Sequence, residues 1–118
     1  MRYMLLIYGN ENAMGSAPPE AVTKMSAAYS IYTQAMKDAG AFLAGDRLQP
    51  TRLATSVRTA GGKPNVIDGP YADTKEQLAG FYMIEAPDLD AAISWASRCP
   101  GAERGTIEVR PVWELQAG

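Results

Sequence analysis

Two short segments of this chain are apolar on both sides of a strand, and this restricts the folds that the chain can adopt. Residues 3–8 (YMLLIY) and residues 80–85 (GFYMIE) lack the alternation of polar and apolar side chains expected of a strand with one solvent-facing side. A sheet that contains such strands needs cover on both of its faces. The covering layers must come from helices of the same chain or from another chain.

Two segments have the features of amphipathic helices. The first starts at residues 18–20 with two prolines and a glutamate, ends at Gly40, and has apolar residues at spacings of three and four: Val22, Met25, Tyr29, Tyr32, Met36 and Ala39. The second helix begins after Asp88, the predicted N-cap, and stops at residues 99–101. Its predicted buried side consists of Leu89, Ala92, Ile93 and Ala96.

Further strands are predicted at residues 41–48, 54–59, 65–68 and 106–115. In the last of these, one side carries Ile107, Val109, Trp113 and Leu115, and the other carries Glu108, Arg110 and Glu114. The order of strands and helices is typical of a ferredoxin-like α+β fold, with an antiparallel sheet and two helices on one face. We expect a single domain that spans residues 1–118.

Two helices cover only one face of such a sheet, so the second face needs cover from another chain. A second copy is the simplest source, because most soluble oligomers are symmetric homo-oligomers. The pattern therefore predicts a homodimer in which two sheets face each other as a dimeric α+β barrel.

Composition and charge argue against several classes of partner. The 11 basic residues are scattered among 13 acidic ones, for a net charge of -2, whereas nucleic-acid binding needs clustered positive charge. No segment approaches the roughly 20 apolar residues of a membrane span, and residues 3–8 are too short for a secretory signal. We expect a cytoplasmic protein that binds neither nucleic acid nor membrane.

The chain contains no histidine and one cysteine, Cys99. This argues against the usual zinc sites and histidine-bound haem, and it excludes a Ser-His-Asp triad or a Cys-His pair. We therefore predict no metal and no cofactor. Any acid–base chemistry falls to Asp, Glu, Lys, Tyr or Arg. Cys99 follows a helix C-terminus, where a thiolate is not stabilised, so we do not expect it to act as a nucleophile.

Residues 68–82 (DGPYADTKEQLAGFY) resemble the DGPF-domain family, within the YCII-related group, and residues 107–111 (IEVRP) continue the resemblance. The resemblance implies a dimeric α+β barrel. It also places the chain in a superfamily that includes cofactor-free isomerases and monooxygenases, and some relatives are associated with extracytoplasmic-function sigma factors. YCII proteins resemble enzymes with a His-Asp pair, which a chain without histidine cannot reproduce.

Asp68 and Glu76 are the candidate catalytic residues of this segment. Asp68 precedes a Gly-Pro pair, so it either forms the turn through its carboxylate or acts as a general base at a strand end. Residues 73–76 and 74–77 match a capping box, which would place them in a short helical turn. Alternatively, Glu76 acts as a base and Lys75 binds a carboxylate ligand.

Glu108 and Arg110 lie two residues apart on a strand and therefore share a face, which we expect to be the one toward the dimer partner. Arg110 either clamps a carboxylate or phosphate group or pairs with Glu108 to stabilise the sheet or the interface. Tyr71 and Tyr82 are candidates to line a pocket with an apolar ring and a hydroxyl group.

Two functions are compatible with these residues. One is a small-molecule-binding protein or a cofactor-independent enzyme of the isomerase, lyase or monooxygenase kind, with a pocket between the sheet and the dimer partner. Such a site is concave and mostly apolar, with a few converging polar groups. The other is a non-catalytic regulatory or interaction module, associated with a sigma factor, whose barrel interior is filled. The sequence leaves open whether the chain is an enzyme.

Overall fold

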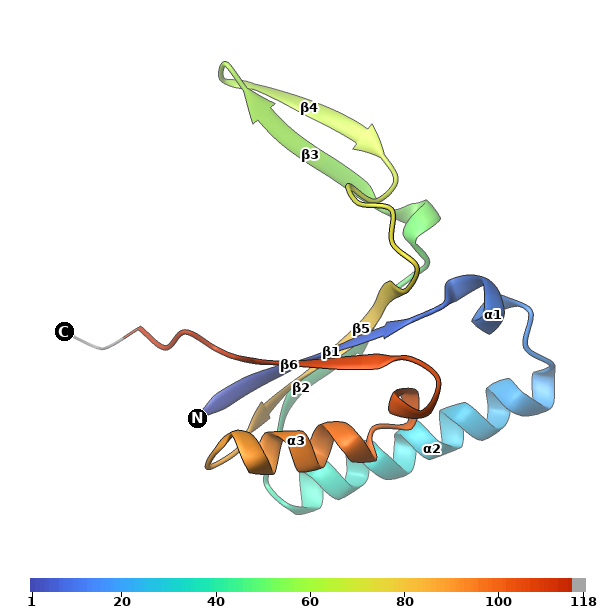
Figure 1. Cartoon of the computed structure of the whole chain (residues 1–118), viewed down its shortest axis with the longest axis vertical. Coiled ribbons are helices and arrows are strands. Elements are labelled where there is room, and N and C mark those ends of the chain that lie inside the picture. Colours follow the sequence, from blue (N-terminus) through green and yellow to red (C-terminus); the bar gives the residue numbers. More distant parts are fainter. Residues whose placement is uncertain (116–118) are drawn as a thin grey trace.

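The computed structural model describes residues 1–115 and confirms the predicted α+β architecture (Figure 1). Four strands form an antiparallel sheet in the order β2-β5-β1-β6. Helices α2 and α3 lie on one face of this sheet, which gives a ferredoxin-like arrangement. The elements are β1 (Arg2–Gly9), α2 (Pro19–Asp38), β2 (Phe42–Arg47), β5 (Gln77–Glu85), α3 (Leu89–Arg98) and β6 (Thr106–Pro111).

The two remaining strands form a separate hairpin. Strands β3 (Thr55–Ala60) and β4 (Lys63–Asp68) pair only with each other and lie between β2 and β5 in the sequence. Short helical segments complete the described chain: α1 (Glu11–Gly15), η1 (Thr51–Leu53) and η2 (Pro100–Glu103).

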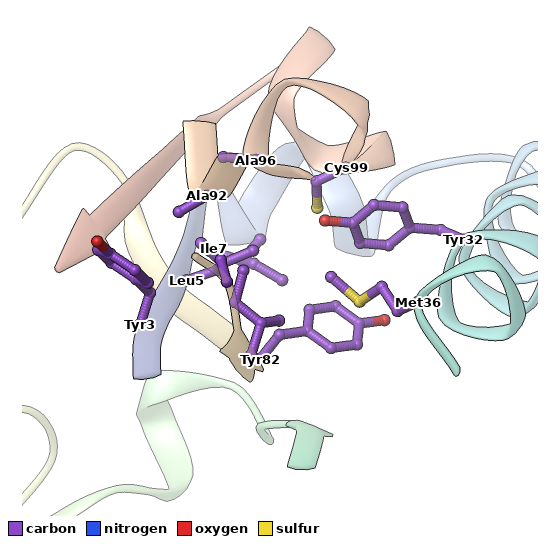
Figure 2. Packing of buried hydrophobic residues seen from close by; sticks show 11 residues of the cluster. Tyr3, Leu5, Ile7, Tyr32, Met36, Tyr82, Ala92, Ala96 and Cys99 are labelled. Carbon is purple, nitrogen blue, oxygen red and sulfur yellow. The ribbon is translucent and has the colours of Figure 1, made fainter. Parts of the chain in front are cut away.

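The core lies between the sheet and the two helices (Figure 2). Leu5, Met36 and Ile84 are fully buried and come from β1, α2 and β5. Tyr32 packs edge-on against Tyr82, with 5.5 Å between ring centroids, and its hydroxyl donates to the Trp95 carbonyl at 2.6 Å. The hydrogen bond joins α2 to α3, and the ring contact joins α2 to β5. Together these contacts hold both helices on the sheet.

The predicted apolar face of α2 is buried only in the second half of the helix. Tyr32 and Met36 are buried, whereas Val22 is 46% exposed. The first turns of α2 extend past the ends of the strands, so the sheet does not cover them (Figure 1).

Helix α3 starts as predicted, because the Asp88 carboxylate accepts a hydrogen bond from the Ala91 N–H at 2.9 Å. Its buried side consists of Ala92 and Ala96, as predicted. Leu89 and Ile93, which we expected on the same side, are about half exposed.

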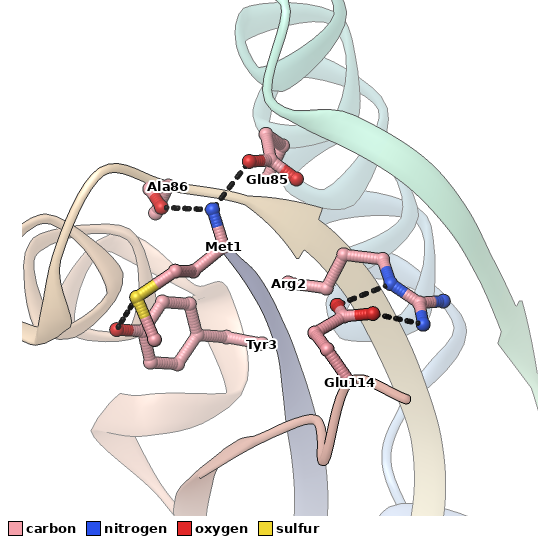
Figure 3. A network of polar contacts seen from close by, with 6 residues as sticks. All are labelled: Met1, Arg2, Tyr3, Glu85, Ala86 and Glu114. Carbon is pink, nitrogen blue, oxygen red and sulfur yellow. Dashed lines mark hydrogen bonds and ion pairs between the residues drawn. The ribbon is translucent and has the colours of Figure 1, made fainter. Parts of the chain in front are cut away.

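Strand β6 ends at Pro111, so the prediction of a strand to residue 115 is wrong after that point. Proline has no N–H to continue a ladder. Trp113 and Leu115 are both 92% exposed and do not join the core. The segment that follows β6 is held instead by Arg2, whose guanidinium donates two hydrogen bonds of 2.7 and 2.9 Å to Glu114 (Figure 3). These hydrogen bonds lower the pKa of the Glu114 carboxyl below its ordinary value.

Within the described residues, no helix is both long enough and apolar enough to cross a membrane.

Candidate functional site

No helix of residues 1–115 covers the face of the main sheet opposite α2 and α3 (Figure 1). This face carries apolar side chains. In the cross-strand register, Met4 lies opposite Met83, and Leu6 lies opposite Phe81. All four residues are only partly exposed. We call this surface the uncovered face. Its centre is apolar, as the sequence of residues 3–8 and 80–85 indicates.

The edge strands β2 and β6 place charged side chains beside these apolar residues, on the same face of the sheet. On β6, Glu108 lies opposite Leu6, and Arg110 lies opposite Met4. On the other side, Asp46 of β2 lies opposite Phe81. Residues directly opposite each other in a ladder point to the same face of the sheet. The uncovered face therefore has an apolar centre between charged edges.

Glu108 and Arg110 form an ion pair along β6. The Glu108 side chain is 39% exposed and that of Arg110 is 68% exposed. One carboxylate oxygen of Glu108, Oε2, is buried, and it is the oxygen that contacts the Arg110 guanidinium in this ion pair. The charge of this buried oxygen is therefore compensated within the strand, by the guanidinium of Arg110.

Glu76 lies at the start of the same edge. Its carboxylate accepts a hydrogen bond of 2.8 Å from the hydroxyl of Thr106, the first residue of β6. Thr106 lies opposite Tyr8 and two residues before Glu108, so it belongs to the same face. Strand β6 therefore brings Glu76, Glu108 and Arg110 together along one side of the uncovered face.

The other candidates lie elsewhere. Asp68 is the last residue of β4 and is exposed, Lys75 is exposed in the segment before β5, and Tyr71 is 87% exposed. These three residues do not converge with the group on β6.

Tyr82 points to the helix side of the sheet, away from Glu108 and Arg110. It is 8% exposed, and its hydroxyl shares a hydrogen bond of 2.7 Å with Thr33 of α2. Burial raises the pKa of Tyr82 above its ordinary value. The ring lies over Gly45 of β2, where a Cβ atom would come within 2.6 Å of Tyr82 Cδ1. Tyr82 therefore belongs to the core rather than to the uncovered face.

Residues 69–76 form no helical turn, so the capping-box prediction is wrong. The Thr74 hydroxyl donates to the Glu76 carbonyl, and the Gln77 amide donates to the Thr74 carbonyl at 2.7 Å. These contacts hold a bend that leads directly into β5. The same residue types that cap a helix also stabilise bends through bonds to nearby backbone groups, which explains the error.

The turn after β4 depends on Gly69. Its N–H donates to the Ala54 carbonyl at 2.7 Å, and its own carbonyl accepts from the Ser56 hydroxyl at 2.8 Å. Gly69 has a φ of 101°, which side chains disfavour. The turn is therefore held by the glycine backbone and by Ser56.

Sequence reasoning missed a polar contact at the root of the hairpin. The Glu11 carboxylate accepts hydrogen bonds from the Thr51 N–H at 2.6 Å and from its hydroxyl at 2.7 Å. The Glu11 N–H in turn donates to the Gln77 side chain at 3.0 Å. These residues are 40 and 66 positions apart in the chain, and no local motif connects them.

Across the described part of the chain, no three His, Cys, Asp or Glu side chains are grouped so that they could hold a metal ion. The groups that we have placed on the uncovered face are the carboxylates of Asp46, Glu76 and Glu108 and the guanidinium of Arg110, beside an apolar surface.

Comparison with known proteins gives the family. Residues 1–116 match the model of the YCII-related domain. The chain is also similar to "Uncharacterized protein R00369" of Rhizobium meliloti (strain 1021), with 35% identity over 114 residues that cover 95% of this chain and 92% of that protein. The chain belongs to the YCII-related family.

Proposed function

We propose that the protein is a homodimer whose two uncovered faces pack toward each other and enclose a site for a small molecule with an apolar body and an anionic group. The observation that carries this proposal is the pattern on the uncovered face, where Met4, Leu6, Phe81 and Met83 are flanked by Glu108 and Arg110. We also assign the chain to the DGPF group within its family, on the basis of residues 68–71 (DGPY).

The apolar centre supports association with a second copy. Full burial of one large aliphatic or aromatic side chain contributes about 1.5–3 kcal/mol. The four central residues are only partly exposed, so each has part of this energy still to gain. A symmetric pair of chains doubles the number of contributing side chains and covers both faces with one interface.

The charged edge supports a ligand site rather than a fully packed interface. A tightly packed barrel interior would have to bury Glu108 and Arg110, and burial of an ion pair costs several kcal/mol per ion in desolvation. A pocket that contains a polar ligand avoids this cost. The planar fork of Arg110 is suited to a carboxylate, and this guanidinium is 68% exposed and has further N–H donors besides the one that meets Glu108.

Any catalysis at this site would be cofactor-independent and would use the carboxylates as proton acceptors. Glu76 and Glu108 lie along the edge that also presents Arg110. An anionic substrate held by Arg110 would place its neighbouring carbon near a carboxylate base, which is the arrangement needed for isomerase or lyase chemistry.

The experiment combines sedimentation with probe binding. The wild-type protein should sediment as a dimer at micromolar concentration and bind 8-anilino-1-naphthalenesulfonate, which has an apolar body and one anionic group. Phenylacetate should displace this probe. Arg110→Gln should weaken probe binding about tenfold, as expected for loss of a charge-assisted contact.

The matched control is Arg104→Gln, at an exposed arginine in the turn before β6, which should leave binding unchanged. A monomeric wild-type protein, or equal probe affinity in the wild type and the Arg110 variant, would contradict the proposal.

A further inference from the structure

The β3–β4 hairpin is a separate sheet that makes few contacts with the rest of the chain. We call residues 51–69 the arm; it comprises η1, β3, β4 and Gly69. In Figure 1 the arm extends from the ends of β2 and β5 and lies apart from both the main sheet and the helices. Every residue of β3 and β4 except Ser56 is exposed. The arm therefore has no core of its own.

One side of the arm has an exposed apolar pair at its middle, between the Thr55–Asp68 pair and the Thr59–Pro64 pair. Val57 lies opposite Val66, and these side chains are 62% and 60% exposed. Thr59 and Pro64 form the next pair on the same side. A two-stranded hairpin is marginally stable by itself in water. The valine pair therefore indicates a surface that packs against something outside the single chain.

The overall size of the chain supports this inference. Its radius of gyration is 16.4 Å. A compact domain of this length has a radius of about 13.5 Å. The difference shows that the extended arm leaves surface unburied that a globular chain would bury.

The root of the arm is anchored, so its direction is set. Glu11 of α1 accepts two hydrogen bonds from Thr51 and so ties the arm to the rest of the chain, whereas the hydrogen bond from the Gly69 N–H to the Ala54 carbonyl closes the arm at its root. The contact of Glu11 with Gln77 connects this root to the first residue of β5. The main sheet thus determines where the arm points.

The arm points to the side from which a partner would approach. In Figure 1 the helices lie below the sheet and the arm rises above it, on the side of the uncovered face. The molecule is only 19 Å deep along the viewing direction, so this separation is not an effect of projection. A second copy on the uncovered face would lie beside the arm.

The charges of the arm also suit a second copy. The arm contains three basic residues and one acidic residue, a net charge of +2: Arg52, Arg58, Lys63 and Asp68. The whole chain has a net charge of -2, which leaves -4 for the rest of it. Opposite charge favours the approach of an arm to the body of another copy.

We propose that the arm packs the Val57–Val66 side across the body of a second copy, so that two arms clasp the dimer reciprocally. This inference rests on the homodimer of the proposed function and adds a second contact region to it. The uncovered faces form the centre of the interface, and the arms form its flanks.

The test compares two double variants of the arm. Val57→Ser with Val66→Ser removes the apolar pair, and Ala60→Ser with Asn65→Ser changes the opposite side of the same hairpin. Sedimentation equilibrium should show that the valine variant raises the dimer dissociation constant about tenfold, because apolar area is no longer buried. The control should stay within about twofold of wild type. Near-UV circular dichroism of the core aromatics confirms that both variants are folded.

Hydrogen exchange of the hairpin amides gives an independent measurement. In the wild-type dimer the amides of β3 and β4 should be protected, and dilution to monomer should remove this protection. A dimer that is equally tight with and without the two valines, with unprotected hairpin amides, overturns the arm proposal and leaves the dimer intact. A wild-type protein that is monomeric overturns the arm proposal and the proposed function together.

Discussion

Leu6 and Phe81 lie directly opposite each other on β1 and β5, on the side of the sheet that α2 and α3 leave uncovered. One position earlier on β1, Leu5 lies opposite Tyr82, and both are buried beneath the helices. Neighbouring residue pairs of the β1–β5 ladder therefore point to opposite faces of the sheet, one covered by the helices and one uncovered. One side of the sheet is completed within the chain, and the other side has the residue types of a core without its cover.

Phe81→Glu should therefore separate the dimer without unfolding the chain. A charge at the centre of the uncovered face would have to be desolvated on association, so the dissociation constant should rise at least about a hundredfold. Sedimentation equilibrium measures the change, and far-ultraviolet circular dichroism checks the fold. The matched control is Ile31→Glu on α2, where the side chain is 73% exposed. A Phe81 variant that dimerises as tightly as this control would contradict the assignment of the interface.

The sequence was sufficient to predict the main sheet and its two helices. Residues 3–8 and 80–85 are apolar throughout, and Asp88 and Gly40 mark helix ends, so these elements follow from local chemistry. The sequence did not predict that β3 and β4 form a separate hairpin. The alternation of polar and apolar side chains in residues 54–68 is the same whether these strands join the main sheet or pair only with each other. The polar contacts of Glu11 could not be predicted from the sequence either, because a hydrogen bond between residues 40 positions apart depends on the folded topology.

The sequence predicted the candidate site only where the alternation of side chains along a strand determines which face of the sheet a residue occupies. Glu108 and Arg110 were placed correctly relative to each other because they lie two residues apart. Asp46 was missed, since its position beside Phe81 depends on the register of β2 against β5. Tyr82 was expected to line a pocket because of its chemical type, whereas its place in the alternation of β5 directs it into the core.

Gly45→Ala should destabilise the protein by about 1–3 kcal/mol, the usual cost of overpacking. The added Cβ would lie 2.6 Å from Tyr82 Cδ1, and the Tyr82 ring is held between Tyr32 and Phe42. Urea unfolding measures the change in free energy. Gly15→Ala is the control, because apart from its chain neighbours and the nearby backbone of α1 no atom lies within 4 Å of its added Cβ. Equal stability of the two variants would show that the ring moves aside freely.

Tyr32→Phe should lower the free energy of unfolding at neutral pH by about 1 kcal/mol, because the Trp95 carbonyl loses its donor. Tyr71→Phe, at an exposed ring, is the control and should have no effect. Chemical denaturation of both variants measures the difference. A Tyr32 variant as stable as wild type would mean that the hydrogen bond contributes nothing.

Alkaline pH should also destabilise the fold through the buried tyrosines. Burial raises the pKa of Tyr29 and Tyr32 above the ordinary value, so the folded state favours the neutral phenol. This stability is fully present below the unfolded-state pKa of about 10 and is lost as pH rises above it, because the unfolded chain then ionises first. Unfolding curves between pH 8 and 12 should show a smaller loss in Tyr32→Phe than in wild type. An identical alkaline profile would contradict the assignment of Tyr32.

Cys99 should react with thiol reagents only when the protein opens. The side chain is 2% exposed, and burial raises the pKa of its thiol, so little thiolate is present at neutral pH. Its sulfur lies 3.7 Å from the Tyr29 hydroxyl, inside the contact between α2 and the end of α3. The reaction with 5,5′-dithiobis(2-nitrobenzoate) should be at least about a hundredfold slower in the native protein than in guanidinium chloride, because reaction requires local opening. Rapid native labelling would show that the end of α3 detaches readily from the core, and the Tyr29–Cys99 contact would then not hold in solution.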